Sequence, residues 1–553
     1  MAPLDRVLST PFALPLLFLL VAGPTVLLTG WRTPPLDVAD EGAHFMRAVQ
    51  VSQGGLVGTV RLPDGQGGNG LLPHGARRLV DEVGRDPSGP PDRAAEARRH
   101  AAGFALGWDA PAPAFFPNTV IYPPLFYLPA AGGILVGRAI GLRPAATLLT
   151  ARVLQGLVCL LLAALALLVA RRGRGLLFGL LALPMGLSLF ASCSQDGPML
   201  AISALAAALL GRLTGARLAP PSRASAARDP APHAGRPSHR PSSSPAAGPS
   251  DEGSSVAAVP DPAPNGPISS GPASLGRPVF GPRSSERARS DHAGPGRASL
   301  DRALPGPVAW TAGRWGLVGL LLGALGAAKP PCAVLALLPL AALLPRPGGG
   351  RRVWWMPVFA SLLGVLLSVG WLLFGALPNG TGFTQNGVSP ALQAHWLILH
   401  PLEAGRVLLR SLRLWGATYV EEMVGVLGWL DVRLWLPAYG LLPAGLVALA
   451  WLDWRAGASR NGFRVPSAAA FLFCFLLAVG VLLVFLSLYL AWTPVGDPVV
   501  LGVQGRYLLP FAIMATTLLP PATAHCRLEA MAAACFMCGA SAVTLAAVFG
   551  RWG

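Results

Sequence analysis

Long apolar runs recur along the whole 553-residue chain, and they constrain its fold more than any other feature. About eleven stretches approach the roughly 20 residues that a helix needs to cross a bilayer core of about 30 Å. In lipid, only helices and closed barrels satisfy their own backbone hydrogen bonds. Because the runs are continuous and only 12% of the residues are charged, we predict an all-α, polytopic transmembrane helical bundle of about eleven spans.

The first apolar stretch, from Pro11 to Gly30, is compatible with two interpretations. It resembles the hydrophobic region of a signal peptide, but it is long for one, and no small-x-small cleavage site precedes Trp31. We therefore favour an uncleaved first span.

The placement of arginine orients the spans, because basic residues concentrate in cytoplasmic loops. Arg6 precedes the first span, which predicts a cytoplasmic N-terminus and an external loop over residues 31–121. The apolar run that begins at Ile121 is expected to lie in the outer interface as a helix rather than span the membrane. This choice puts Arg171–Arg174 and the later basic loops in the cytoplasm. A second external loop is predicted over residues 375–433.

Residues 214–312 have a different composition, dominated by Pro, Ser, Ala, Gly and Arg. Such a segment cannot bury enough apolar surface to offset the entropy of ordering it. We predict a disordered cytoplasmic linker between two membrane halves, 1–213 and 313–553. A passive insertion is favoured over a segment whose arginines contact anionic lipid.

The net charge of +17 does not indicate a nucleic-acid partner, because most of it lies where the positive-inside rule places it and no nucleic-acid motif accompanies it. Of the 43 basic residues, 42 are arginine, and Lys329 is the one lysine. The first external loop contains no cysteine, so no disulfide framework is expected there.

The predicted threading gathers unusual polar residues on the outer side of the membrane. Ionisable groups at membrane depth are costly and mark functional sites by default. The gathered residues are Asp40, Glu41, His44, Tyr122, Asp196, Lys329, Asp431 and Arg506. Asp431 is interpreted as a residue that orders its loop, and the others are site candidates together with Tyr507, which follows Arg506.

The adjacent carboxylates Asp40 and Glu41 are candidates for acid–base chemistry. Partial burial near a bilayer makes a carboxylate a better proton acceptor. Either one can be the base while the other orients it or binds a metal, and on a helix His44 shares a face with both. In the alternative interpretation, Asp40 only caps a short interfacial helix.

Lys329 and Arg506 are the candidate cations. Lys329 interrupts an apolar run, and Pro330 and Pro331 hold the chain after it in a non-helical shape. A compact ammonium there suits a phosphate oxygen, and the alternative is a lysine that snorkels toward headgroups. Arg506 can bind phosphate bidentately, or it only anchors its span at the interface.

Several motifs resemble, in order, those of a large bacterial family of uncharacterised polytopic membrane proteins. They are Pro34-Pro35, Asp40-Glu41-Gly42-Ala43-His44-Phe45, Tyr122-Pro123-Pro124-Leu125-Phe126-Tyr127, Ser194-Gln195-Asp196, Lys329-Pro330-Pro331, Gly428-Trp429-Leu430-Asp431 and Gln504-Gly505-Arg506-Tyr507. The family more often has proline where this chain has Gly42 and Gln195, and the linker is an unusual insertion.

That family in turn resembles the GT-C membrane glycosyltransferases, which include aminoarabinose and protein O-mannosyl transferases. The resemblance implies a GT-C-like bundle, a catalytic Asp in the first external loop and a polyprenyl-phosphate sugar donor. By residue, it implies that Asp40 is the base and Glu41 supports it. Lys329 and Arg506 become candidates for the donor phosphate, and only Lys329 has a close motif counterpart.

We therefore expect a glycosyltransferase in the bacterial plasma membrane that moves a sugar from undecaprenyl- or decaprenyl-phosphate to a cell-envelope glycan or protein on the outer face. His44, Tyr122, Asp196 and Tyr507 are expected to bind substrate. A divalent metal, Mg²⁺ or Mn²⁺, at Glu41 or His44 is compatible with this role but not required. The alternatives are a transporter or flippase of lipid-linked envelope precursors and a non-catalytic assembly protein.

Overall fold

The computed structural model describes residues 10–58, 69–84, 93–215, 307–344, 354–379, 387–461, 467–521 and 527–553. These residues belong to one compact unit that joins the chain before the predicted linker to the chain after it. The linker itself, 214–312, lies outside the described residues except at its two ends. Those ends belong to the helices α11 (Asp196–Gly215) and α12 (Pro307–Ala328).

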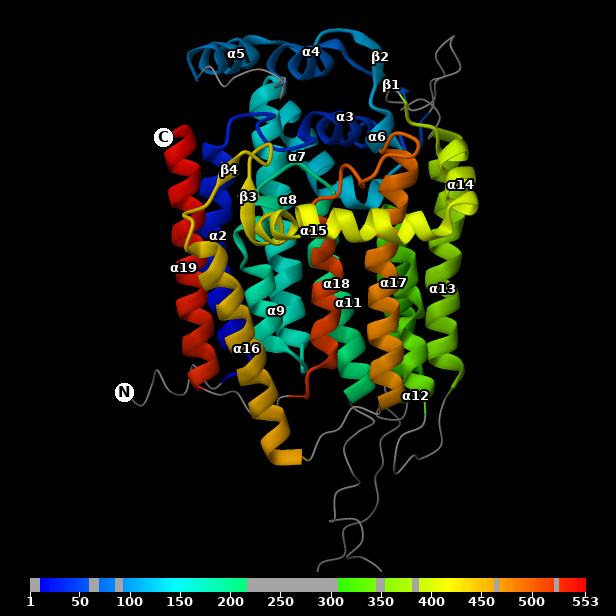
Figure 1. The fold of residues 1–553 in the computed structure, drawn as a ribbon. Helices are drawn as coiled ribbons and strands as arrows, with labels where there is room; N and C mark the ends of the chain where they lie inside the picture. Colours follow the sequence, from blue (N-terminus) through cyan, green and yellow to red (C-terminus); the bar gives the residue numbers. More distant parts are fainter. Residues whose placement is uncertain are drawn as a thin grey trace, which may run out of the picture. The chain divides into compact units, whose positions relative to one another are not determined.

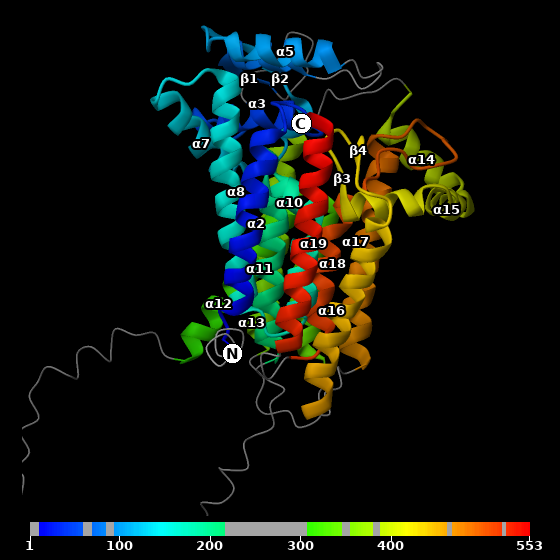
Figure 2. The ribbon, with the colours of Figure 1, turned by 90° about the vertical axis from the view of Figure 1, so that its left-hand side faces the viewer.

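Seven described helices are long and apolar enough to cross a membrane, by length and composition. They run side by side in two views of the bundle (Figures 1 and 2). They are α2 (Ala13–Arg32), α8 (Pro144–Val169), α11, α12, α13 (Trp355–Trp371, continued by the short turns η4, Leu372–Ala376, and η5, Leu377–Asn379), α17 (Ser467–Ala491) and α19 (Arg527–Trp552). The prediction of an all-α membrane bundle is therefore confirmed.

The other four predicted spans do not form long apolar helices, so the count of about eleven is not confirmed. Prolines interrupt the first two of the four spans named next, because a proline removes a backbone donor and ends or distorts a helix. The four are α9 (Arg174–Leu181) with α10 (Pro184–Phe190), the 3₁₀ helix η3 (Pro330–Leu343), α16 (Ala438–Asn461), and α18 (Leu509–Ala515) between the 3₁₀ turns η6 (Gly505–Leu508) and η7 (Thr516–Leu518). Helix α16 has 24 residues and continues through Pro443, but its second half carries Asp453 and Arg455.

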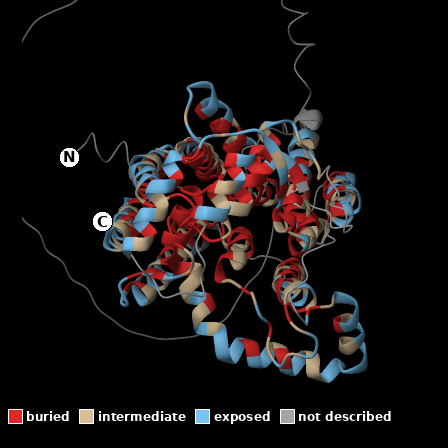
Figure 3. Ribbon diagram, turned by 90° about the horizontal axis from the view of Figure 1, so that it is seen from above, coloured by how far each residue is buried: buried red, intermediate tan, exposed pale blue. Residues whose placement is uncertain are grey.

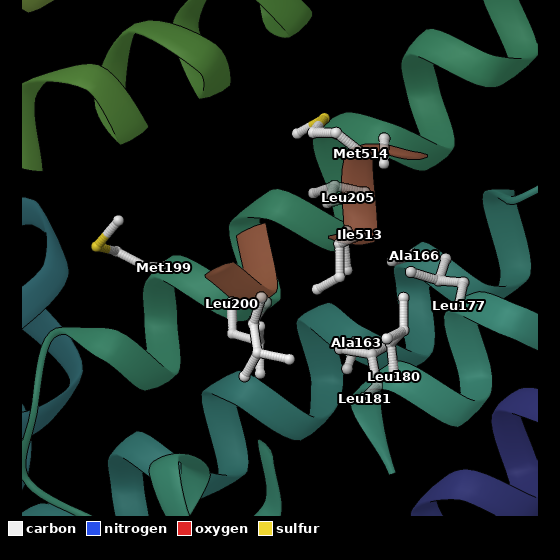
Figure 4. Packing of buried hydrophobic residues seen from close by; sticks show 14 of the residues in the cluster. Ala163, Ala166, Leu177, Leu180, Leu181, Met199, Leu200, Leu205, Ile513 and Met514 are labelled. Atoms are coloured by element: carbon white, nitrogen blue, oxygen red, sulfur yellow. The ribbon is translucent and has the colours of Figure 1, made fainter. Parts of the chain in front are cut away.

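The interior of the bundle is a continuous apolar core. Leu200 and Leu205 of α11, Leu177 and Leu181 of α9, and Ile513 of α18 belong to this core (Figure 4). Seen from above, buried residues gather in the interior of the bundle and exposed ones lie around it (Figure 3). Between membrane helices, such dispersion contacts replace the hydrophobic effect as the source of cohesion.

Helices α12 and α13 pack through small residues. A side chain at Gly319 would meet the carbonyl oxygen of Ala360 at 2.5 Å, and one at Gly323 would meet that of Gly364 at 2.9 Å. Glycine is therefore required for this close approach, which is typical of helix contacts in membranes.

A layer of shorter elements covers one end of the bundle (Figures 1 and 2), and we call it the first-loop layer. It consists of α3 (Glu41–Ser52), α4 (His74–Val83), α5 (Arg93–Ala105), α6 (Pro117–Val120) and an antiparallel ribbon of β1 (Asn69–Pro73) and β2 (Pro111–Phe115), in which Asn69 lies opposite Phe115. Phe45, Leu79 and Phe116 bury it against Ile134 and Leu148 in a second apolar cluster. The described part of the predicted first loop is thus a folded layer.

Two further helices lie in the segments that the sequence assigned to the outer side, and for the first of them an interfacial helix was predicted. Helix α7 (Leu128–Ala139), preceded by the turn η1 (Pro124–Tyr127), has 12 residues. At 1.5 Å per residue it is about 18 Å long, which is too short to cross a bilayer core. Helix α15 (Pro401–Gly425) follows α14 (Pro390–Leu399); it lies across the bundle in Figure 1 and is seen nearly end-on beside it in Figure 2. A two-residue ribbon, β3 (Val426–Leu427) with β4 (Val432–Arg433), follows it.

Candidate functional site

A cavity of about 380 Å³ lies where segments from both halves of the chain meet. Its lining comes from the start of α3, the turn before η1, the start of α11, the α12–η3 junction, the end of α17 and the start of η6. Seven of the eight predicted site residues line it: Asp40, His44, Tyr122, Asp196, Lys329, Arg506 and Tyr507. Glu41 does not. The structure therefore brings together residues that are up to 467 positions apart in the sequence.

Four charged side chains form an alternating chain along the cavity wall. Lys329 Nζ lies 2.7 Å from Asp196 Oδ1, and Arg506 Nε lies 3.5 Å from Asp196 Oδ2. Arg506 Nη2 then donates to Asp40 Oδ2 at 2.8 Å. The two positive and two negative charges balance, which offsets much of the cost of removing each from water. We call this space the ion-paired cavity.

Asp40 precedes α3, but it does not cap the helix with its side chain. Its backbone is left-handed, with φ of 63°, a conformation that Asp tolerates better than most residues. The carboxylate turns toward Arg506 and is 41% exposed. Among the described residues only Oδ2 is bonded, so Oδ1 is available to accept a proton. The alternative of a side-chain cap is therefore wrong.

Glu41 turns away from the cavity and is fully buried. Arg152 of α8 donates to its carboxylate through Nε at 2.8 Å and through Nη2. The backbone N–H groups of Leu36 and Cys193 donate to the same carboxylate at 3.1 and 2.9 Å. Arg152 also donates to the carbonyl of Gly30 at the end of α2. This Glu41–Arg152 pair ties the start of α3 to α2, α8 and the turn before α11.

His44 is buried on the wall of the cavity, next to two tyrosines. Its Nδ1 lies 2.7 Å from the hydroxyl of Tyr127, and its ring stacks on Tyr122 with centroids 6.2 Å apart. Burial lowers the pKa of His44 to about 4 and outweighs the nearby carboxylates of Asp196 and Asp40. Burial also raises the pKa of the Tyr122 phenol above its ordinary value. Both groups are therefore neutral at physiological pH.

Lys329 is the single extended residue between two helices. Helix α12 ends at Ala328, and Lys329 has φ of −136° before Pro330 and Pro331 begin η3. Lys329 itself is therefore non-helical, but the predicted non-helical shape after it is wrong, because Pro330 and Pro331 begin the 3₁₀ helix η3. The ammonium lies 4.1 Å from the centre of the Tyr507 ring as well as beside Asp196, and the side chain is 20% exposed. It points into the cavity, which is not the geometry of a lysine that snorkels toward headgroups.

Sequence reasoning missed several residues that build this region. Arg152 is a lone charge inside a predicted span, so the argument that flagged Lys329 applied to it as well. Tyr127 lay inside a quoted motif but received no role. Asn118 and Trp492 line the cavity without a distinguishing sequence signal. Asp431 accepts the N–H of Trp429 at 3.0 Å, which supports its interpretation as a loop-ordering residue.

The described residues contain no group of three or more His, Cys, Asp or Glu side chains placed to hold a metal ion. The two carboxylates in the cavity are engaged by Lys329 and Arg506 instead. The suggestion of a divalent metal at Glu41 or His44 stays a prediction.

Comparison with known proteins identifies a family but no characterised relative. No curated protein and no solved structure matches the chain. The model of a family described as predicted membrane protein (DUF2142) matches residues 26–227 and 309–515, which include all eight predicted site residues. The gap in this match, 228–308, covers most of the predicted linker. The chain therefore belongs to the DUF2142 family of predicted membrane proteins.

Proposed function

We propose that this protein is a GT-C-like glycosyltransferase that moves a sugar from a polyprenyl-phosphate donor to a cell-envelope acceptor. The observation that carries the proposal is the shared cavity of Asp40, Lys329 and Arg506. One partly exposed carboxylate and two cations are the groups that transfer from a sugar phosphate requires. In this proposal the first-loop layer faces the outside of a bacterial plasma membrane, and the N-terminus is cytoplasmic.

The donor phosphate binds at Lys329 and Arg506 in this mechanism. The cavity wall beside them is apolar along Val484, Leu488 and Trp492, which suits the first isoprene units of the lipid. When the bond between the anomeric carbon and the phosphate oxygen breaks, the electron pair stays on the phosphate. Cations already held in place by Asp196 and Asp40 stabilise that growing charge without reorganising.

Asp40 acts as the general base. The acceptor oxygen attacks the anomeric carbon while Oδ1 of Asp40 takes its proton, and the configuration at that carbon inverts. General-base catalysis of this kind contributes about 10²–10⁴-fold to a rate. The Glu41–Arg152 pair supports Asp40 by fixing the residue next to it. Asp196 holds the cations, while His44, Tyr122 and Tyr507 line the space for the sugar.

The test is transfer from a radiolabelled polyprenyl-phosphate sugar by the full chain in nanodiscs, with deproteinised cell-envelope extract as acceptor. Asp40→Asn should lower the transfer rate at least 100-fold. Asp81→Asn is the matched control, because Asp81 lies in the same layer and pairs with Arg77 at the surface. Undiminished transfer by Asp40→Asn would overturn the base assignment.

The same variants separate the enzyme from a flippase. A flippase would move a fluorescent polyprenyl-phosphate lipid between leaflets, and it would tolerate Asp40→Asn better than Lys329→Gln. An enzyme should lose transfer in both variants and show no leaflet exchange above that of empty liposomes.

A further inference from the structure

A second cavity, of about 340 Å³, also has Asp40 in its lining. Its lining is Leu36, Asp40, Gly42, Ala43, Val80, Gly84, Asn118 and Trp429. Asp40 and Asn118 also line the ion-paired cavity, so these two residues form the boundary between the two spaces. The 41% exposure of the Asp40 carboxylate fits a group with open space beside it.

The two cavities differ in charge. The ion-paired cavity has Lys329 and Arg506 in its wall, whereas Asp40 is the single charged residue among the described residues that line the second cavity. A phosphate in the second cavity would meet the carboxylate of Asp40, and the described lining residues offer it no cation, because Arg506 pairs with Asp40 from the ion-paired cavity. A neutral ligand with hydroxyl groups can instead donate to Asp40, bond the amide of Asn118 and pack its C–H face on the ring of Trp429.

The second cavity is held in shape by contacts between distant segments. The indole N–H of Trp429 donates to the carbonyl of Leu36 at 2.9 Å, and Ala39 N–H donates to the carbonyl of Gly428 at 3.1 Å. These contacts fix the ring of Trp429 against the segment that leads to Asp40. A wall built in this way is preorganised for a ligand.

The backbone at this contact is also strained. Leu36, Asp40 and Leu430 are three of the four non-glycine residues with positive φ among those described. Such conformations cost about 1–3 kcal/mol and persist where the surroundings enforce them, commonly at functional sites.

We propose that the second cavity is the acceptor subsite and that it binds a saccharide through its hydroxyl groups. This inference rests on the proposed function. Inversion requires the acceptor oxygen and the leaving phosphate on opposite faces of the anomeric carbon. Separate cavities for the donor phosphate and the acceptor are compatible with this requirement, and Asp40 lines both of them. The acceptor O–H bond breaks toward Asp40, the new C–O bond forms, and the old C–O pair leaves on the phosphate.

The test fills the second cavity and leaves the ion-paired cavity unchanged. Val80 lies on α4 and lines only the second cavity, so Val80→Phe should occupy it. Val495→Phe is the matched control, because Val495 is an exposed loop residue that lines neither cavity. Gly42 and Gly84 offer poorer sites, because a Cβ there would meet Val80 within 3 Å.

Binding is measured without turnover, by saturation-transfer NMR on nanodiscs with methyl α-D-manno-, gluco- and galactopyranoside as probes. The wild type and Val495→Phe should bind at least one probe, and Val80→Phe should lose at least 90% of that signal. Binding of decaprenyl phosphate to the same samples should not change. In the transfer assay, Val80→Phe should raise the acceptor KM at least tenfold with the donor KM unchanged.

Full probe binding by Val80→Phe, or no probe binding by the wild type, would overturn the acceptor subsite. Neither result bears on the assignment of the donor phosphate to Lys329 and Arg506. That assignment would be contradicted if decaprenyl phosphate did not bind the wild type. Trp429→Phe gives a second readout, because it keeps an aromatic face but loses the bond to Leu36. A melting midpoint near that of the wild type with weakened probe binding supports the subsite, and full probe binding contradicts a role for the indole.

Discussion

Asp40 and Glu41 are neighbours in the sequence, yet their carboxylates have opposite environments. Glu41 is fully buried, and Arg152 and two backbone N–H groups donate to it. Asp40 is 41% exposed, and among the described residues Arg506 alone bonds its side chain. A buried charge with all its bonds made joins segments of the fold. A carboxylate with one free oxygen beside a cavity can exchange a proton, so the comparison separates a structural acid from a candidate catalytic one.

The largest expected effect is on stability and tests the structural role of Glu41 through its partner Arg152. Arg152→Met leaves Glu41 as an uncompensated buried charge, and removing one partner of such a pair costs about 3–5 kcal/mol of unfolding free energy. The measurement is thermal unfolding of the purified protein in detergent. Arg433→Met is the control, because Arg433 pairs with Glu421 at the surface and such pairs contribute at most about 1 kcal/mol. Equal melting midpoints for the two variants would contradict a structural role for Arg152.

His44, which lines the ion-paired cavity, makes the stability of the protein depend on pH. Burial lowers its pKa from 6.5 to about 4, so the unfolded chain binds the proton more tightly than the folded one. The free energy of unfolding is therefore highest above about pH 6.5, where His44 is neutral in both states, and it decreases as the pH falls toward 4. At pH 5 the loss is about 2 kcal/mol relative to pH 7.5. Melting midpoints at the two pH values measure it.

Two histidine variants check the source of that loss. His44→Gln should remove most of the difference between the two pH values. His74→Gln should keep it, because His74 is exposed in the first-loop layer. If His44→Gln retains the full difference, another group carries the pH dependence.

The convergence of the cavity residues followed from the sequence, because arginine placement puts the segments that carry them on one side of the membrane. The different roles of Asp40 and Glu41 could not be predicted from the sequence, because they depend on Arg152, which lies 111 residues after Glu41. Adjacent residues at a helix start point in different directions, and the direction of each depends on a left-handed backbone at Asp40 that the pattern does not reveal.

The count of about eleven spans is not confirmed, and for two of the predicted spans the sequence contains the reason. Pro184 divides one predicted span into α9 and α10, and Pro330, Pro331 and Pro339 accompany the 3₁₀ helix η3. Hydrophobicity alone counts these runs as spans, whereas proline chemistry predicts broken ones. The second cavity was beyond prediction, because Trp429 reaches Leu36 from 393 positions away.

A smaller effect, on the rate of transfer, tests whether the shape of the Lys329 ammonium matters as well as its charge. Lys329→Arg keeps the charge but replaces a compact ammonium between Asp196 and the Tyr507 ring with a larger planar group. We expect about a tenfold loss of transfer, or about 1.4 kcal/mol, mainly as a higher donor KM. The control is Arg455→Lys, which changes an exposed cation over the ring of Trp451. Equal activity of Lys329→Arg and the wild type would show that only the charge of Lys329 matters.

The smallest expected effect is on stability, at Asp40 itself. Asp40→Asn should change the unfolding free energy by less than about 1 kcal/mol, because the pair is partly exposed and Arg506 keeps Asp196 at 3.5 Å. Glu41→Gln, one residue away, should cost about 3 kcal/mol or more, because it leaves Arg152 buried without its partner. Melting curves of the two variants measure the contrast directly. If Asp40→Asn unfolds as readily as Glu41→Gln, Asp40 is a structural acid too, and its loss of transfer no longer identifies a base.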